Sequence, residues 1–315
     1  MRNFKSSPPS LERKRFNDFI SKYGLLYLLI LPGFLYLLIF KYLPMFGLVI
    51  AFKNYNPSMG FEGIFTAKWV GLKHFRKFMG SYYFSEIMRN TLVISFTKFF
   101  IGFPLPILIA IMLNDLKSEK FKKFVQTACY MPNFMSWVVT CGILVTIFAS
   151  DGIFNSILAR FGVSGKAYLS DPKSFFAIII ASDVWKYCGW DSIIYLAAIT
   201  SIDPNLYEAA SIDGAGKWKQ IWCITLPGIA TVIGITLTLR MGGILEAGFE
   251  QILLLYSPAT YEVADIIDTY VYREGLANAN YSFSTAVGLF KSVLAMLMML
   301  VSNRISKKVT GEGIW

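Results

Sequence analysis

The sequence predicts an all-α polytopic membrane protein with six transmembrane helices. Of its 315 residues 55% are hydrophobic and only 16% are charged, whereas soluble domains carry about a quarter charged residues. Its mean hydropathy is positive. Long apolar runs recur along the chain, and a helix needs about 20 mainly apolar residues to cross the hydrocarbon core.

Six such runs are the predicted spans. In lipid each span must satisfy its own backbone hydrogen bonds, so a run of this length is expected to be helical. They cover approximately residues 23–43, 91–113, 125–149, 175–199, 228–246 and 283–302. The stretch Met45–Phe52 is too short to span and is predicted to be an interfacial elbow. Gly24–Phe40 continues through large residues, which predicts an uncleaved first span rather than a signal peptide.

The net charge of +10 is compatible with nucleic acid or with the anionic leaflet of a membrane. The basic residues form short clusters between apolar runs, not one continuous stripe. This distribution predicts membrane lipid as a partner and no nucleic acid.

Chemistry-bearing residues are scarce. The four cysteines have no Cys-x-x-Cys spacing, and His74 is the single histidine, so neither a metal site nor a nucleophile–base pair is expected. The sequence contains no Gly-x-x-x-x-Gly-Lys-Ser/Thr phosphate loop. We therefore expect no cofactor, no metal and no enzyme activity, and any ATP hydrolysis must come from another chain.

Lysine and arginine in the loops favour a cytoplasmic N-terminus, because cytoplasmic loops carry an excess of them. The first outer loop disagrees with this rule, since it holds Lys53, Lys68, Lys73, Arg76, Lys77 and Arg89. The outer stretches 53–89 and 247–281 are too long for simple turns. Each is either an aromatic belt with interfacial helices or a platform for an extracytoplasmic partner.

The segment 200–227, between the fourth and fifth spans, has strong local signals. Asp203 is a good N-cap, and Pro204 fits the first helical position. Gly214 and Gly216 are expected to end that helix, and a second short helix should follow over Lys217–Ile224 before Pro227 begins the next span. Such a segment is either a protein-docking element or a passive helical linker.

This segment resembles the EAA loop of binding-protein-dependent ABC importer permeases. The resemblance lies in Glu208-Ala209-Ala210, Asp213-Gly214-Ala215, Ile224 and Leu226-Pro227. Further similarity to the sugar-uptake branch, with its maltose- and alginate-type permeases, extends over nearly the whole chain after the N-terminal tail. It is carried by Tyr42–Lys53, Tyr130–Val139 and Asp268–Gly275.

The resemblance implies the type I ABC importer transmembrane-domain fold. Residues 1–22 and 303–315 would be cytoplasmic tails flanking a permease domain at 23–302 in the cell membrane, with both termini cytoplasmic. The EAA helix would couple the chain to the ATPase through Glu208, Ala209, Ala210, Asp213 and Gly214. The implied heteromeric complex contains a second homologous permease, two cytoplasmic ATP-binding subunits and an extracytoplasmic solute-binding protein.

Ionisable residues within membrane spans usually face a cavity or a partner. They are Lys98, Asp183, Lys186, Asp191, Arg240, Glu246 and Lys291. Aromatic faces stack on sugar rings and carboxylates bind hydroxyls, so a saccharide path is predicted along Asp183, Trp185, Tyr187, Trp190, Asp191, Arg240, Glu246 and Asn133. The alternative is pairing within the membrane, for example of Asp183 with Lys186, and packing of tryptophans between helices.

The function expected from these features is that of a membrane-spanning permease subunit. It would serve an ATP-driven, binding-protein-dependent importer of a saccharide, such as an oligosaccharide or polysaccharide fragment, and form half of the translocation pathway. The alternative is a secondary transporter or channel, which should show inverted repeats with broken helices. The sequence shows no such repeat.

Overall fold

The computed structural model describes residues 11–310, and this part of the chain is helical with short connections. Its longer helices are α1 (Leu11–Leu37), α5 (Phe84–Gly102), α6 (Pro104–Asn114), α7 (Glu119–Tyr130), α8 (Trp137–Phe148), α10 (Pro172–Thr200), α14 (Ala230–Gly242) and α18 (Tyr281–Thr310). The shorter ones are α2 (Leu43–Met45), α3 (Gly63–Thr66), α4 (Lys73–Met79), α9 (Ile153–Ala159), α11 (Pro204–Ile212), α12 (Lys217–Gln220), α13 (Leu226–Gly228), α15 (Phe249–Leu255), α16 (Tyr261–Ala264) and α17 (Ile267–Tyr272). The 3-10 and π turns are η1 (Leu38–Tyr42), η2 (Phe46–Phe52), η3 (Pro57–Met59), η4 (Met131–Phe134), η5 (Ile221–Thr225), η6 (Pro258–Thr260) and η7 (Arg273–Ala277).

The all-α polytopic class is confirmed. Within the part of the chain that the structure describes, four helical stretches are long and apolar enough to cross a membrane: Lys22–Phe52, Phe84–Asn114, Trp137–Ala159 and Tyr281–Arg304. A fifth candidate is the pair Lys217–Gly228 and Ala230–Gly242, which meet at a bend of 63°. Helix α10, the predicted fourth span, has 29 residues, and its apolar surface is interrupted by Asp183, Lys186 and Asp191.

The predicted span 125–149 is wrong as a single helix. The amphipathic helix α7 ends at Tyr130, and α8 starts anew at Trp137. Pro132 begins the intervening turn η4, and Ser136 caps α8 by accepting a hydrogen bond from the Val139 amide at 3.3 Å. These local stop and start signals prevail over the continuous apolar run.

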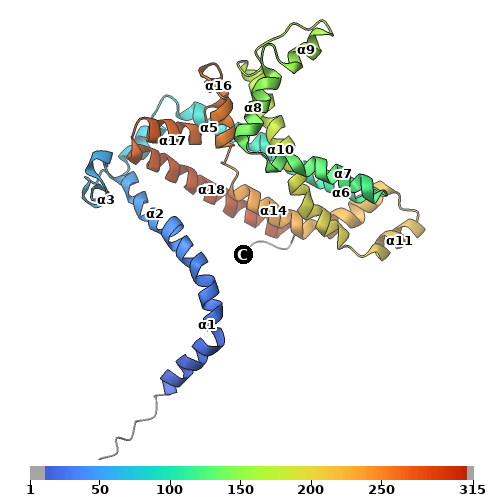
Figure 1. Cartoon of the computed structure of the whole chain (residues 1–315), viewed down its shortest axis with the longest axis horizontal. Coiled ribbons are helices and arrows are strands. Elements are labelled where there is room, and N and C mark those ends of the chain that lie inside the picture. The colour runs from blue at the N-terminus through green and yellow to red at the C-terminus, as the bar shows by residue number, and fades with distance from the viewer. Residues whose placement is uncertain (1–10, 311–315) are drawn as a thin grey trace, which may run out of the picture.

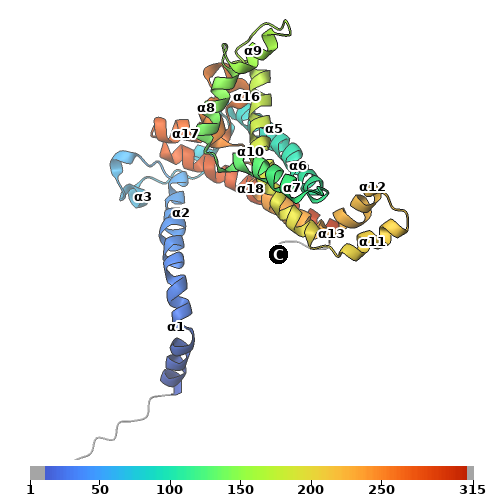
Figure 2. The same ribbon diagram turned by 45° about the vertical axis from the view of Figure 1, so that its right-hand side comes forward.

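Helix α1 and its continuation to Phe52 extend away from the other helices as an arm (Figures 1 and 2). The predicted interfacial elbow at Met45–Phe52 is not separated from this helix. It continues the helix as α2 and η2, and η2 packs against α18.

The predicted tails are helical in part. Within the described residues, α1 begins at Leu11 and α18 runs to Thr310, so parts of both tails, 1–22 and 303–315, are helical. Residues 1–10 and 311–315 of these tails lie outside the described part of the chain.

Helix α10 organises the core by packing against α5, α6 and α7. One cluster of buried residues joins it to α5, α8 and α15 through Ile94, Phe175, Ile179 and Ile252. A second cluster joins it to α6 and the start of α14. The two clusters hold α10 on several sides, which fixes the position of the charged side chains it carries.

A close helix contact on α10 predicts a large effect of a small substitution. A Cβ atom added at Gly189 would overlap the backbone of Cys129 in α7. We expect Gly189→Ala to destabilise the protein by about 1–3 kcal/mol, since the two helices must separate. Thermal unfolding in detergent would measure this, with Gly142→Ala in α8 as the matched control, because nothing lies within 4 Å of a Cβ there. Equal unfolding temperatures for the two variants would contradict the close packing.

Candidate functional site

The segment 200–227 folds into two short helices joined by a glycine turn. Asp203 caps α11 as predicted, accepting a hydrogen bond from the Asn205 amide at 2.9 Å. The backbone at Gly214 has a φ of 75°, the left-handed conformation that glycine adopts freely at a helix end. The Ala215 amide donates to the Ala210 carbonyl at 2.8 Å, which closes the turn.

Side-chain hydrogen bonds hold the two helices together. The Gln220 amide in α12 donates to the Ser211 hydroxyl at 2.9 Å and to the Ala215 carbonyl at 3.1 Å. The hydroxyls of Tyr207 and Thr225 lie 3.0 Å apart. α11 is therefore fixed to the helix that leads into α14, and it cannot behave as a loose linker.

The chain past α12 differs from the prediction in one respect. The second helix was expected to end at Ile224, with Pro227 starting the next span. Instead the helical path continues through η5 and α13, and the break lies at Ile229, whose φ and ψ are −105° and 9°. The bend of 63° follows from this residue, not from Pro227.

The predicted coupling residues lie together on α11 and its turn, at one end of the molecule (Figure 1). Glu208, Ala209, Asp213 and Gly214 are exposed, and Ala210 is half-buried. Large apolar side chains beside them are also exposed, with Ile212 at 87% and Trp218 at 76%. Exposed apolar surface rimmed by charge is typical of a protein-interaction site.

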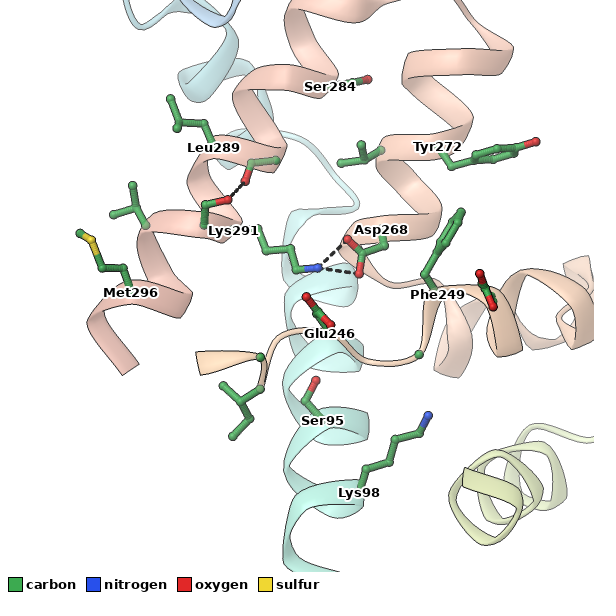
Figure 3. A pocket seen from close by; sticks show the side chains of 18 of the residues that line it. Ser95, Lys98, Glu246, Phe249, Asp268, Tyr272, Ser284, Leu289, Lys291 and Met296 are labelled. Carbon is green, nitrogen blue, oxygen red and sulfur yellow. Dashed lines mark hydrogen bonds and ion pairs between the residues drawn. The ribbon is translucent and has the colours of Figure 1, made fainter. Parts of the chain in front are cut away.

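A cavity of about 1470 Å³ lies between α5, α10, α14, α15, α17 and α18. Its wall is mostly apolar and aromatic, with contributions from Phe99, Trp137, Phe249 and Tyr272. Charged side chains project into it from several helices (Figure 3). An apolar cavity with a few convergent polar groups is the usual form of a small-molecule site.

Ion pairs connect the helices around this cavity. Lys98 in α5 donates to Asp183 at 2.8 Å and to Gln251 at 2.6 Å. Lys291 in α18 donates to both oxygens of Asp268 at 2.6 and 2.7 Å (Figure 3). A third pair joins Arg240 in α14 to Asp191 in α10.

The alternative that Asp183 pairs with Lys186 is wrong. Asp183 pairs with Lys98 instead, and Lys186 is buried with its ammonium donating to the carbonyls of Pro132 and Asn133 at 3.3 and 3.4 Å and to that of Met135. It therefore satisfies the backbone at the break between α7 and α8, where helix hydrogen bonds are missing.

Five of the eight predicted path residues line the cavity: Asp183, Tyr187, Asp191, Arg240 and Glu246. Trp185, Trp190 and Asn133 do not. Trp185 and Trp190 are largely exposed on the outside of α10, and Trp190 packs edge-on against Phe134 with ring centroids 5.3 Å apart. The assignment of these three to the path stays a prediction.

The structure adds cavity residues that the predicted path lacks. Lys98 and Lys291 are isolated charges in apolar spans. The sequence marks them as unusual, but it does not show that they face the cavity. Glu250, Asp268 and Tyr272 come from the outer stretch 247–281, and only tertiary packing brings them to the cavity. Among residues 11–310, no group of His, Cys, Asp or Glu side chains could hold a metal ion.

A cavity lined by helices of a membrane protein, together with an exposed helix at one end of the molecule, is consistent with a transport permease. Residues 102–311 match the family described as "Binding-protein-dependent transport system inner membrane component". The chain belongs to this family, as its EAA-like segment predicts. It is a multi-pass membrane protein and an ABC-transporter permease, not an enzyme.

Individual relatives and solved structures are similar to most of the chain. The chain is 45% identical over 305 residues to the polygalacturonan/rhamnogalacturonan transport system permease protein YteP of Bacillus subtilis (strain 168), covering 96% of this chain and 94% of YteP. It is 28% identical to the arabinooligosaccharides permease AraP of the same organism, covering 97% and 96%. A chain of the bacterial alginate ABC transporter, crystallised with a periplasmic protein carrying an alginate pentasaccharide, superposes with a TM-score of 0.86 at 43% identity, covering 94% and 98%. The type I importer fold is thereby confirmed.

Proposed function

We propose that this chain is the membrane-spanning permease subunit of an ATP-driven, binding-protein-dependent importer of saccharides. It forms half of the translocation pathway, and a second homologous permease forms the other half. The observation that carries the proposal is the cavity, whose aromatic faces and carboxylates are suited to sugar rings and hydroxyls. The similarity of the chain to YteP, AraP and the alginate transporter, each named for a saccharide, supports it.

The partners follow from the two ends of the molecule. Two cytoplasmic ATP-binding subunits serve the complex, and α11 docks on one of them through Glu208, Ala209, Ala210, Asp213 and Gly214. Both termini of the chain are then cytoplasmic. The segments 53–89 and 247–281 face outward, where an extracytoplasmic solute-binding protein delivers the saccharide.

We propose that contacts between neighbouring elements link α11 to the cavity. A movement of α11 acts on η5 through the Tyr207–Thr225 contact. From there it passes the bend at Ile229 into α14, which packs along α18. α14 carries Arg240, whose ion pair with Asp191 lies at the cavity wall. Closure of the ATPases can thus rearrange the groups that face the solute.

Reconstitution tests this function. The complete complex, placed in proteoliposomes with ATP inside and loaded binding protein outside, should accumulate a labelled oligosaccharide only when both are present. Accumulation driven by a proton or sodium gradient without ATP would establish the secondary transporter instead. Omission of the second permease should abolish uptake, since half of the cavity wall is then missing.

A further inference from the structure

The charges that line the cavity do not balance. Its basic residues are Lys98, Arg240 and Lys291, and its acidic residues are Asp183, Asp191, Glu246, Glu250 and Asp268. Each basic residue has one acidic partner, in the pairs Lys98–Asp183, Arg240–Asp191 and Lys291–Asp268. Two carboxylates, those of Glu246 and Glu250, are left over.

These two carboxylates are exposed to the cavity without a partner of their own. Glu246 belongs to the loop between α14 and α15 and lines the same cavity as the Lys291–Asp268 pair (Figure 3). Glu250 is in the first turn of α15. Within residues 11–310, neither carboxylate takes part in an ion pair or a hydrogen bond. Both oxygens of each group are therefore free to accept hydrogen bonds from a solute.

Lys186 forms no ion pair with these carboxylates. Its ammonium is buried and donates to the carbonyls at the break between α7 and α8. It does not line the cavity. The face that this chain presents to the solute is acidic.

Aromatic rings line the same cavity as the free carboxylates. Phe249 and Tyr272 both line the cavity, and their ring centroids are 5.7 Å apart. An apolar face beside two acceptor groups suits a sugar unit that is rich in hydroxyls and carries no charge.

We propose that Glu246 and Glu250 make this half of the cavity favour uncharged sugar units over carboxylated ones. The inference rests on the proposed function and names the substrate class. A hydroxyl donates to the free carboxylates, whereas a uronate brings a like charge next to them. The bacterial alginate importer, by contrast, imports an acidic polysaccharide.

The test measures direct binding of sugars to the permease complex, so the selectivity of the solute-binding protein does not affect the result. The assembled complex of both permeases and the ATPases is titrated without binding protein, and saturation-transfer NMR gives the Kd of a galactose and of a galacturonate oligosaccharide of equal length. We expect the wild type to bind the neutral sugar more tightly. In the variant Glu246→Gln/Glu250→Gln the ratio of the two Kd values should shift by about tenfold toward the acidic sugar.

Two further measurements separate charge from structure. The wild-type ratio should shrink as salt is raised, because ions screen the repulsion, while the ratio of the variant should stay constant. The control Glu62→Gln/Glu262→Gln removes two exposed carboxylates outside the cavity lining and should leave the ratio unchanged.

The outcomes distinguish this inference from the proposed function. If both sugars bind and the variant does not change their ratio, the inference fails while the saccharide importer stands. A variant that loses neutral and acidic sugar equally also overturns the inference, since the carboxylates then serve binding in general. If the wild type binds neither sugar, the saccharide assignment fails and takes the inference with it.

Discussion

Glu208→Lys is expected to abolish ATP-driven uptake without unfolding the chain. Glu208 is exposed on α11, and within the described residues its carboxylate forms no ion pair. The permease fold therefore loses little when the charge is reversed. A docked ATPase would face a positive charge where it now faces a negative one. Unfavourable charge contacts in an interface cost several kcal/mol of binding free energy. A loss of about 3 kcal/mol already weakens binding more than a hundredfold.

Two measurements on the same preparation check this prediction. The amount of ATPase that co-purifies with the permease should fall to background, while circular dichroism of the purified chain should keep its helical signal. Glu119→Lys at the start of α7 is the matched control, because it reverses an exposed glutamate outside the 200–227 segment. Normal uptake by Glu208→Lys would remove α11 from the coupling mechanism.

Lys98→Met should be the most destabilising single change at the cavity. Lys98 is only 8% exposed and donates to both Asp183 and Gln251. Methionine keeps the side-chain length but leaves Asp183 without its partner and the Gln251 oxygen without a donor. Breaking a buried pair in this way costs about 3–5 kcal/mol.

Thermal unfolding in detergent measures this loss, and the chain offers a control of the same chemistry. Lys166 pairs with Asp171 at 3.1 Å on the surface, where both side chains are exposed, so Lys166→Met should cost less than about 1 kcal/mol. The double variant Lys98→Met/Asp183→Asn should recover part of the stability, because no uncompensated charge remains. Equal effects of Lys98→Met and Lys166→Met would show that the cavity pair is solvated like the surface pair.

Local signals made the segment 200–227 predictable. A capping aspartate, a proline at the first helical position and a glycine in the left-handed conformation act within a few residues, so Asp203, Pro204 and Gly214 determine α11 wherever it packs. The break at 131–136 has signals of the same kind in Pro132 and Ser136. The predicted span 125–149 rests on apolar composition instead, and composition does not distinguish one long helix from two shorter ones.

The cavity was predictable only in part, because its contacts are remote in sequence. Lys98 and Asp183 are 85 positions apart, and Lys98 and Gln251 are 153 apart. The sequence indicates that a charged residue in a span needs an oppositely charged partner. It does not show which of the several charged residues in the other spans is that partner. Lys186 lies only three positions from Asp183, but its ammonium donates to the carbonyls of Pro132 and Asn133, and Asp183 pairs with the distant Lys98.

The arm formed by the first helix affects how these stability measurements are to be read. None of the most apolar 18-residue window within Lys22–Phe52 is buried inside the chain, so the core around α10 does not stabilise this part of the arm. Cooperative unfolding requires shared contacts. In detergent, the isolated subunit should therefore melt in two independent transitions. Unfolding of the arm gives a weak transition. The sharper transition comes from the core around α10, and its midpoint is the quantity to compare between the variants.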